Sequence, residues 1–226
     1  MDQEAKKFWE SEEQVNRFAA RDPDHRLVEL LNQYSSPSQT DVLDIGCAGG
    51  RNAVLLAKLG FSFFALDASF GMVQKTRERL SKFLDSSKVN ERVLHLPMHD
   101  LSCFKDQQFD LIIALGIFHN AISGKEWNLT LSESSRILKV GGQMLVSNFS
   151  SASRPEGIPL VRDKNEPNVY TGFGHGKMYL IEGDALDRDF AAYHMQPVTP
   201  TATVHVKTEN GERVTINALY KKIKHS

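Results

Sequence analysis

The stretch from Val42 to Gly50 reads VLDIGCAGG, an apolar strand that runs directly into a glycine turn. A helical pattern follows from Asn52, and the next apolar run, Phe61–Leu66, is closed by an acidic residue, Asp67. A strand, a glycine turn, a helix and a second strand that ends in an acid form the layout of a nucleoside-binding βαβ unit. In such a unit the glycines let the backbone approach a ligand, and the acid receives ribose hydroxyls.

The spacing of the glycines decides which ligand this turn suits. A dinucleotide site reads G-x-G-x-x-G, but the frame that starts at Gly46 has Ala48 and Arg51 where the second and third glycines belong. A different frame, D-x-G-x-A-x-G, runs from Asp44 to Gly50. It resembles the first motif of the class I S-adenosylmethionine methyltransferases, with Ala48 at the middle glycine. The missing glycines disfavour an NAD-type oxidoreductase.

Strands and helices alternate after this turn, which favours a parallel sheet with helices on both faces. The strands are expected at Asp41–Ile45, Phe61–Leu66, Arg92–Leu96, Phe109–Leu115 and Gln143–Asn148. Helices are expected from Asn52 to Lys58, from a Ser69 cap to about Leu84, and from Lys125 to Leu138, the last closed by Val140-Gly141-Gly142.

The C-terminal part of the chain has a different pattern. Two strand-like runs, Val198–Lys207 and Glu212–Lys222, are joined by Thr208-Glu-Asn-Gly211. Asn-Gly between such runs is a strong hairpin signal. The sheet is therefore expected to end in an antiparallel hairpin, which is a second resemblance to the class I methyltransferases.

Further segments resemble the motifs of this family in order and spacing. They are Ala65-Leu-Asp67-Ala-Ser69, Met98-His99-Asp100-Leu101, Phe109–Leu115 and Arg136-Ile-Leu-Lys-Val-Gly-Gly142, the last with Val140 in place of proline. The resemblance covers most of residues 40–222. It implies an α/β fold, a Rossmann-like three-layer sandwich, with a mostly parallel seven-stranded sheet and an antiparallel C-terminal hairpin.

The resemblance also implies the cofactor, S-adenosylmethionine, with S-adenosylhomocysteine as the product. Asp67 would bind the ribose diol, Asp44 would orient the loop and approach the methionine ammonium, and Asp100 would accept the adenine amino group or serve only as a turn residue. The expected cofactor contacts are Asp44, Gly46, Cys47, Ala48, Gly49, Arg51, Asn52, Asp67, Ala68, Met72, His99, Asp100, Leu101, Leu115 and Gly116.

Gly50-Arg51-Asn52 resembles the same place in the tellurite-resistance methyltransferases. Arg51 there would pair with the cofactor carboxylate, and a surface arginine at a helix start is the alternative.

On the acceptor side, His119 is the expected catalytic base or substrate contact, because it follows the fourth strand at the edge where ligands of open α/β sheets collect. A loop-packing histidine is the alternative. Trp9, Asn120, Tyr170 and His175 are the other expected substrate contacts. The segment 149–182 is either a substrate-covering insertion or a plain edge hairpin, Val169–Phe173 with Lys177–Ile181.

Residues 1–38 read as a helical arm or lid, and residues 39–226 as the methyltransferase core. Within the arm, Asp22-Pro23 is expected to start a second helix that ends near Tyr34. The arm is too short to bury a core alone, so one domain is expected.

Composition narrows the remaining classes. The net charge is −1 and hydrophobic residues make up 41% of the chain, which gives no electrostatic footprint for nucleic acid. No run is long and apolar enough for a membrane span. The two cysteines are isolated, so no metal site is expected, and they favour a cytoplasmic protein.

These observations predict a methyltransferase that acts on a small-molecule acceptor by in-line displacement, as a monomer or homodimer. Two alternatives stay open: a non-catalytic S-adenosylmethionine-binding or regulatory protein, and a methyltransferase that acts on RNA or protein.

Overall fold

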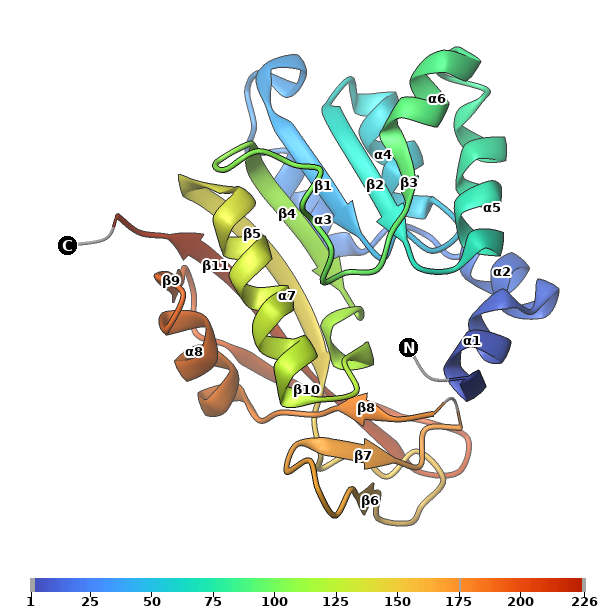
Figure 1. Ribbon diagram of the computed structural model, residues 1–226, viewed down its shortest axis with the longest axis vertical. Coiled ribbons are helices and arrows are strands. Elements are labelled where there is room, and N and C mark those ends of the chain that lie inside the picture. Colours follow the sequence, from blue (N-terminus) through green and yellow to red (C-terminus); the bar gives the residue numbers. More distant parts are fainter. Residues whose placement is uncertain (1–2, 175, 225–226) are drawn as a thin grey trace.

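The computed structural model describes residues 3–174 and 176–224, and its centre is one twisted sheet (Figure 1). The strands follow the order β10-β11-β5-β4-β1-β2-β3, and a short strand, β9, pairs with the free part of β11. Their bounds are β1 Asp41–Ile45, β2 Ser62–Asp67, β3 Val93–His95, β4 Phe109–Leu115, β5 Leu138–Phe149, β9 Met195–Pro197, β10 Ala202–Lys207 and β11 Glu212–Lys222.

Strand directions confirm the predicted fold class. Strands β1 to β5 pair in parallel, whereas β11 runs antiparallel to both β5 and β10. The turn between β10 and β11 falls at the predicted Asn-Gly. Because β1, β2 and β4 are parallel neighbours, their carboxyl ends meet at one edge, where open α/β sheets bind ligands.

Helices cover both faces of the sheet, as the alternation of strands and helices predicts. Helices α3 (His25–Leu31), α4 (Arg51–Leu59) and α5 (Phe70–Leu80) pack with Val42, Leu111 and Ile113 in one core cluster. Helices α7 (Gly124–Ile137) and α8 (Gly183–Ala191) pack with Leu43, Ile112 and Ala114 in the other. Successive residues of β1 and β4 thus point to opposite faces, since side chains alternate along a strand.

The N-terminal segment forms three short helices. Helices α1 (Gln3–Glu10) and α2 (Glu12–Ala19) are separated at Ser11, whose side chain caps α2. The prediction of Asp22 as the cap of the next helix is wrong. Asp24 caps α3 instead, with its carboxylate accepting from the Arg26 N–H at 3.0 Å. Helix α3 lies in the core, whereas α1 and α2 lie at the sheet edge beside α5 (Figure 1).

Two predicted helix ends are also wrong. Helix α5 stops at Leu80, and a separate helix, α6 (Ser86–Arg92), follows. Helix α7 stops at Ile137, and Leu138 already has extended backbone (φ −77°, ψ 131°). Gly141 (φ +84°) and Gly142 therefore lie inside β5, where Phe109 pairs with Leu138 but Leu111 pairs with Gln143. The glycines form a bulge rather than a helix cap, because the chain turns back too closely there for a Cβ on Gly142.

The segment 149–182 contains a small antiparallel sheet of β6 (Val161–Arg162), β7 (Val169–Thr171) and β8 (Met178–Tyr179). The β7–β8 pair confirms the predicted edge hairpin. Two 3₁₀ turns, η1 (Pro37–Gln39) and η2 (Phe118–Asn120), complete the elements of the described residues. Within this part of the chain no helix has the length and apolar character to cross a bilayer.

Candidate functional site

A cavity opens at the carboxyl ends of β1, β2 and β4, beneath α1 and α2. Its volume is about 870 Å³ when space open to solvent is included. The predicted site residues that line it are Trp9, Gly46, Cys47, Ala48, Arg51, Asn52, Asp67, Ala68, Met72, Leu115, Gly116 and Asn120. The first motif, the second strand and the fourth strand therefore converge as the sequence predicts.

The glycine turn forms the floor of the cavity. Gly46 (φ +73°), Ala48 (φ +50°) and Gly50 (φ +79°) all have left-handed backbone. Ala48 thus keeps the conformation expected of the missing middle glycine, at a modest cost in strain. At Gly46 a Cβ would lie 2.7 Å from the Ile117 side chain. The turn is held in place because the Gly46 and Cys47 N–H groups donate to the Leu66 carbonyl, at 2.8 and 2.9 Å.

Asp67 lies at the end of β2 and faces the cavity. Its two carboxylate oxygens accept hydrogen bonds from the N–H groups of Ala48 and Ser69, both at 2.9 Å. Burial raises the pKa of Asp67 to about 6, although these two N–H groups favour the ionised form. Each oxygen keeps a second lone pair, so the carboxylate can still accept from two ligand hydroxyls.

Asp44 and Asn52 lie under the turn. The Asn52 amide donates to Asp44 Oδ1 at 3.4 Å. Asp44 Oδ2 and Asn52 Oδ1 are buried and accept no hydrogen bond from the described residues. Burial raises the pKa of Asp44 to about 7, opposed by the Asn52 hydrogen bond and the charge of Arg51. Burying two acceptors without a donor costs free energy. These oxygens would suit a ligand group that is cationic and donates hydrogen bonds.

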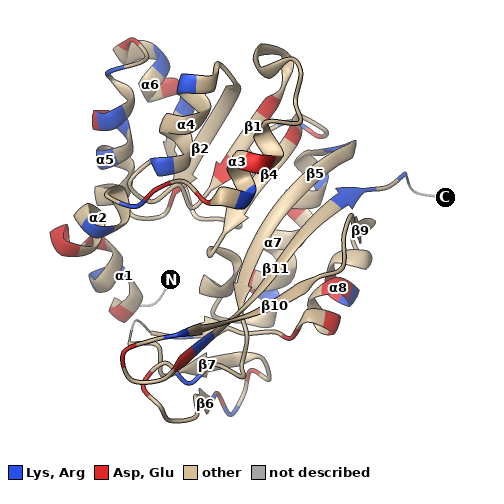
Figure 2. Cartoon of the chain, turned by 180° about the vertical axis from the view of Figure 1, so that it is seen from behind, with Lys and Arg blue, Asp and Glu red and all other residues tan. Residues whose placement is uncertain are grey.

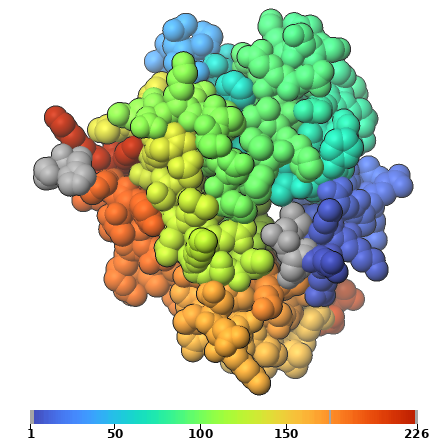
Figure 3. Space-filling model, in the orientation of Figure 1, coloured from blue at the N-terminus to red at the C-terminus, as the bar shows by residue number. Residues whose placement is uncertain are grey.

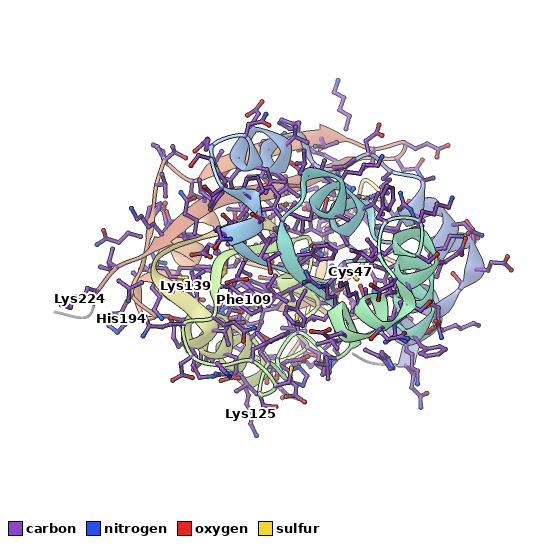
Figure 4. All side chains as sticks on the ribbon, turned by 90° about the horizontal axis from the view of Figure 1, so that it is seen from above. Cys47, Phe109, Lys125, Lys139, His194 and Lys224 are labelled. Carbon is purple, nitrogen blue, oxygen red and sulfur yellow. The ribbon has the colours of Figure 1, made fainter. Side chains whose placement is uncertain are left out.

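Cys47 also lies in the turn, in the interior of the molecule, whereas Lys125, His194 and Lys224 lie at its periphery (Figure 4). Burial, together with the nearby carboxylates, raises the pKa of its thiol well above the ordinary value. Its sulfur lies 3.6 Å from the Thr76 hydroxyl. The thiol therefore stays protonated and is a wall of the cavity rather than a nucleophile.

The N-terminal arm forms the outer wall, with Trp9 and Phe18 lining the cavity. Its backbone is held by α5, because the Ser69 hydroxyl donates to the Trp9 carbonyl at 3.1 Å. The Glu10 carboxylate accepts from the Phe70 and Gly71 N–H groups at the start of α5, at 2.7 and 3.0 Å. This carboxylate caps α5 and compensates the positive end of the helix.

A second attachment joins the arm to the glycine turn. One Arg79 nitrogen donates to both the Ala19 and Gly49 carbonyls, at 2.8 and 2.7 Å. A Cβ on Gly49 would lie 2.4 Å from the Ala19 Cβ. Gly49, a predicted cofactor contact, is thus absent from the cavity surface because the arm packs on it. These contacts of Ser69, Glu10 and Arg79 with the arm and turn are together called the arm latch; Figure 3 shows the arm packed directly on this region.

The rest of the lining is mainly apolar, with Met72, Pro97, Met98, Leu115 and Ile117. Its polar group is Glu126 at the start of α7. The Glu126 carboxylate accepts from the Ile122 N–H at 3.1 Å and lies 3.0 Å from His99 Nδ1. His99, a predicted cofactor contact, is therefore held at the edge of the cavity rather than on its lining.

Two more predicted cofactor contacts lie away from the cavity. The Asp100 carboxylate accepts from the Ser102 hydroxyl at 2.7 Å and is exposed, which favours the turn-residue interpretation. Leu101 is fully buried in the core with Phe104 and Phe109. Neither side chain therefore lines the cavity.

His119 is only 3% exposed and lies behind the cavity wall. A Cβ on Gly116 would lie 3.7 Å from His119 Cε1. The imidazole stacks on Phe149 with ring centroids 4.1 Å apart, and Phe149 stacks in turn on Phe173 at 4.9 Å. Asn120 does reach the cavity, and its amide donates to the Ile117 carbonyl at 3.1 Å.

Of the remaining substrate predictions, Tyr170 lies in β7 and does not line the cavity. His175 lies outside the described residues. The cavity also has a lining that the sequence did not single out: Phe18, Leu66, Pro97, Met98, Ile117 and Glu126. Ser123-x-x-Glu126 was visible as a capping box, but such a box signals only the start of a helix.

Comparisons with known proteins agree with this geometry. Residues 42–142 match the family described as "Methyltransferase domain". The ubiquinone biosynthesis O-methyltransferase of Rickettsia felis is 24% identical over 128 residues, 57% of this chain and 49% of the relative. The demethylmenaquinone methyltransferase of Tropheryma whipplei is 29% identical over 114 residues, 50% of this chain and 44% of the relative. The chain spans about half the length of the curated relatives it matches.

Solved structures share the fold over most of the chain. A SAM-dependent methyltransferase of Methanosarcina mazei superposes with a TM-score of 0.66 at 18% identity, covering 91% of this chain and 100% of that one. The 1,6-didemethyltoxoflavin-N1-methyltransferase of Burkholderia thailandensis, with S-adenosylhomocysteine bound, gives a TM-score of 0.60 at 16% identity, covering 93% and 87%. Residues 42–142 thus match a methyltransferase domain, and the chain has the fold of these solved structures.

Proposed function

We propose that the protein transfers a methyl group from S-adenosylmethionine to a small-molecule acceptor by in-line displacement. The observation that carries the proposal is that Asp67 and Asn52 line one cavity, while Asp44, which is absent from the lining, lies directly behind Asn52. The cavity offers the Asp67 carboxylate for a ribose diol, and beneath its glycine turn lie two buried oxygens, of Asp44 and Asn52, that accept no hydrogen bond from the described residues and would suit an ammonium group. It has no arrangement that would suit a pyrophosphate, since its turn lacks the spacing of a dinucleotide site.

The chain's own residues would hold the cofactor at its polar groups. Asp67 would accept both ribose hydroxyls, and Asp44 with Asn52 would accept from the methionine ammonium. Arg51 lines the same end of the cavity and would pair with the methionine carboxylate. Met72, Met98 and Leu115 would flank the adenine with apolar surface.

When bound, the cofactor supplies a methyl group on a sulfonium, a leaving group that needs no further activation. The protein would then contribute mainly by alignment, which is worth several kcal/mol. The latched arm would exclude water at Trp9 and Phe18. His119 stays the predicted base for an acceptor that must lose a proton, and that role requires the acceptor to reach past Gly116.

The class of acceptor is part of the proposal. The relatives act in ubiquinone biosynthesis and on demethylmenaquinone, as their names state, and another structure carries a bound heterocycle, 1,6-didemethyltoxoflavin. Their names support a small organic acceptor for this chain.

Calorimetric titration with S-adenosylmethionine, S-adenosylhomocysteine and NAD tests the cofactor assignment. We expect micromolar binding of both adenosyl ligands and none of NAD; binding of NAD alone would overturn the proposal. Transfer of a labelled methyl group to a panel of small acceptors then tests catalysis. Tight cofactor binding without transfer to any acceptor would instead favour a regulatory protein.

A further inference from the structure

Two arginines of the arm stack on a residue that lines the cavity. Arg17 lies in α2 and Arg21 follows the end of this helix, and their guanidinium carbons lie 5.6 and 4.2 Å from the centre of the Phe18 ring. Phe18 itself lines the cavity. Stacking on an aromatic face holds a guanidinium in place without neutralising its charge.

Two further arginines approach from other parts of the chain. Arg51 lines the cavity at the start of α4, and its guanidinium lies 3.4 Å from the Asp22 backbone carbonyl, so it reaches the arm. Arg213, at the start of β11, has its guanidinium carbon 5.4 Å from the centre of the Phe149 ring. Phe149 is the ring on which His119 stacks. The β10–β11 hairpin extends to the side of the molecule that carries the arm (Figure 2).

These four residues, the arginine cluster, are close enough to repel one another. Burial and the charges of Arg17, Arg51 and Arg213 together lower the pKa of Arg21. The arm, the start of α4 and the start of β11, which are distant in sequence, thus place positive charge near Arg21.

None of the four arginines forms an ion pair with a carboxylate of the described residues, although the charge of Arg51 acts on Asp44. Within residues 3–174 and 176–224, the arginine ion pairs belong to Arg26 and Arg136. The Arg213 Nε–H group is buried and has no acceptor in the same part of the chain. A buried donor without an acceptor is costly, and a bound anion would remove that cost.

The cofactor alone does not account for four guanidinium groups. Its single carboxylate can accept one bidentate pair, and Arg51 is the arginine nearest to the Asp44–Asn52 end of the cavity. Arg17 and Arg21 stack on Phe18, which lines the cavity, and Arg213 stacks on Phe149, so three guanidinium groups remain for another anion.

We propose that the arginine cluster binds an anionic group, a carboxylate or a phosphate, of the methyl acceptor. The acceptor is therefore a small organic acid with an apolar body that fits against Phe18. This inference rests on the proposed function and adds the charge of the substrate to it.

The test uses the full chain with saturating S-adenosylhomocysteine, so that the cofactor carboxylate is already supplied. Benzoate and phenyl phosphate are titrated by calorimetry, with benzamide as the uncharged match. The variant Arg21→Gln/Arg213→Gln removes two charges of the cluster, and Arg188→Gln removes an exposed arginine of α8 as the control. Circular dichroism checks that each variant is folded.

We expect at least one of the two anions to bind about tenfold more tightly than benzamide, and the better anion identifies the group. The double variant should lose about tenfold in anion affinity, with benzamide affinity unchanged and Arg188→Gln behaving as wild type. Equal binding of benzamide and both anions, or unchanged anion affinity in the double variant, would overturn the inference alone. Failure to bind S-adenosylhomocysteine would overturn the proposed function and this inference with it.

Discussion

The proposed cofactor side and the proposed acceptor side of the cavity are built in different ways. On the cofactor side, Gly46 directly follows β1, whereas Asp67 and Leu115 end the neighbouring parallel strands β2 and β4, and backbone N–H groups fix the Asp67 carboxylate. On the acceptor side, Phe18, His119 and Arg213 come from an arm, a 3₁₀ turn and an antiparallel strand. Their places depend on side-chain packing across long stretches of sequence.

The difference separates what the fold dictates from what this chain adds. A sheet edge with a glycine turn presents the turn backbone and a strand-end carboxylate to a cofactor, and this arrangement depends little on the rest of the chain. The proposed acceptor side depends on the arm latch, because Phe18, which lines it, belongs to the arm. Changes on the cofactor side should therefore act on cofactor affinity directly, and changes at the latch should act through the arm.

The largest effect is expected from Asp67→Asn. The change removes the ionised acceptor for the ribose hydroxyls, which should cost about 3 kcal/mol of binding free energy, or roughly 100-fold in affinity for S-adenosylhomocysteine. Calorimetry measures the loss, and the exposed Asp184→Asn serves as the matched control. Wild-type affinity in Asp67→Asn would show that this carboxylate is not the ribose site.

Gly49→Ala tests whether the arm matters to the cofactor side. The new Cβ would lie 2.4 Å from the Ala19 Cβ, so the arm must move away. Overpacking of this kind costs about 2 kcal/mol, and we expect roughly 30-fold weaker binding of S-adenosylhomocysteine.

Hydrogen exchange of residues 3–20 should show lost protection in Gly49→Ala. Gly183→Ala is the control, because a Cβ there would meet its nearest neighbour at an ordinary 3.6 Å. An arm that stays protected in Gly49→Ala would contradict the role assigned to the latch.

A change of pH should affect the free energy of unfolding and the affinity for S-adenosylhomocysteine in opposite directions. Because the pKa values of Asp67 and Asp44 are raised to about 6 and about 7, the folded protein holds these protons more tightly than the unfolded chain. Their contribution to the free energy of unfolding is therefore largest below about pH 4 and falls as the pH rises through about 7. Affinity for S-adenosylhomocysteine should change in the opposite direction, because binding needs the ionised carboxylates.

We expect roughly 15-fold weaker binding at about pH 6 than at about pH 7.5, since about half of Asp67 and about a tenth of Asp44 are ionised at the lower pH. Calorimetry in buffers of equal ionic strength measures it. In Asp67→Asn the part of the slope near pH 6 should vanish; a flat profile in the wild type would mean that neither carboxyl is protonated in the free site.

Glu10→Gln should have the smallest effect. It weakens the cap of α5 by about 1 kcal/mol, equivalent to about 3 °C in Tm for a chain of this size. The same change should lower the pKa of Asp67, because the charge of Glu10 helps to raise it. Scanning calorimetry and a carboxyl titration by NMR measure the two effects, with the exposed Glu29→Gln as control. An unchanged Tm would mean that α5 is capped equally well by solvent.

The sequence predicted the parts of the molecule that local patterns determine. Glycine spacing located the turn, apolar runs located β1, β2 and β4, and Asn-Gly located the terminal hairpin. It misplaced the glycines at 141 and 142, because a bulge within β5 and a helix cap need the same left-handed residue.

On the acceptor side the sequence was a poorer guide, for a physical reason. Arg213 and Phe18 are almost 200 residues apart, and no periodicity shows that both lie near Arg21. His119 looked accessible because it follows a strand end, yet packing against Phe149 turned it inward. Contacts of this kind arise from tertiary packing, which single-sequence patterns do not encode.

The arm latch also bears on the rate of turnover. Arg79 and Glu10 attach the outer wall of the cavity to the helix and turn that would hold the cofactor. We expect S-adenosylhomocysteine to leave only after these contacts open. The rate at which the arm opens would then limit the rate at which product is exchanged for S-adenosylmethionine. A stronger latch would then make a tighter binder and a slower enzyme, which sets an upper limit on how firmly such an arm can be held.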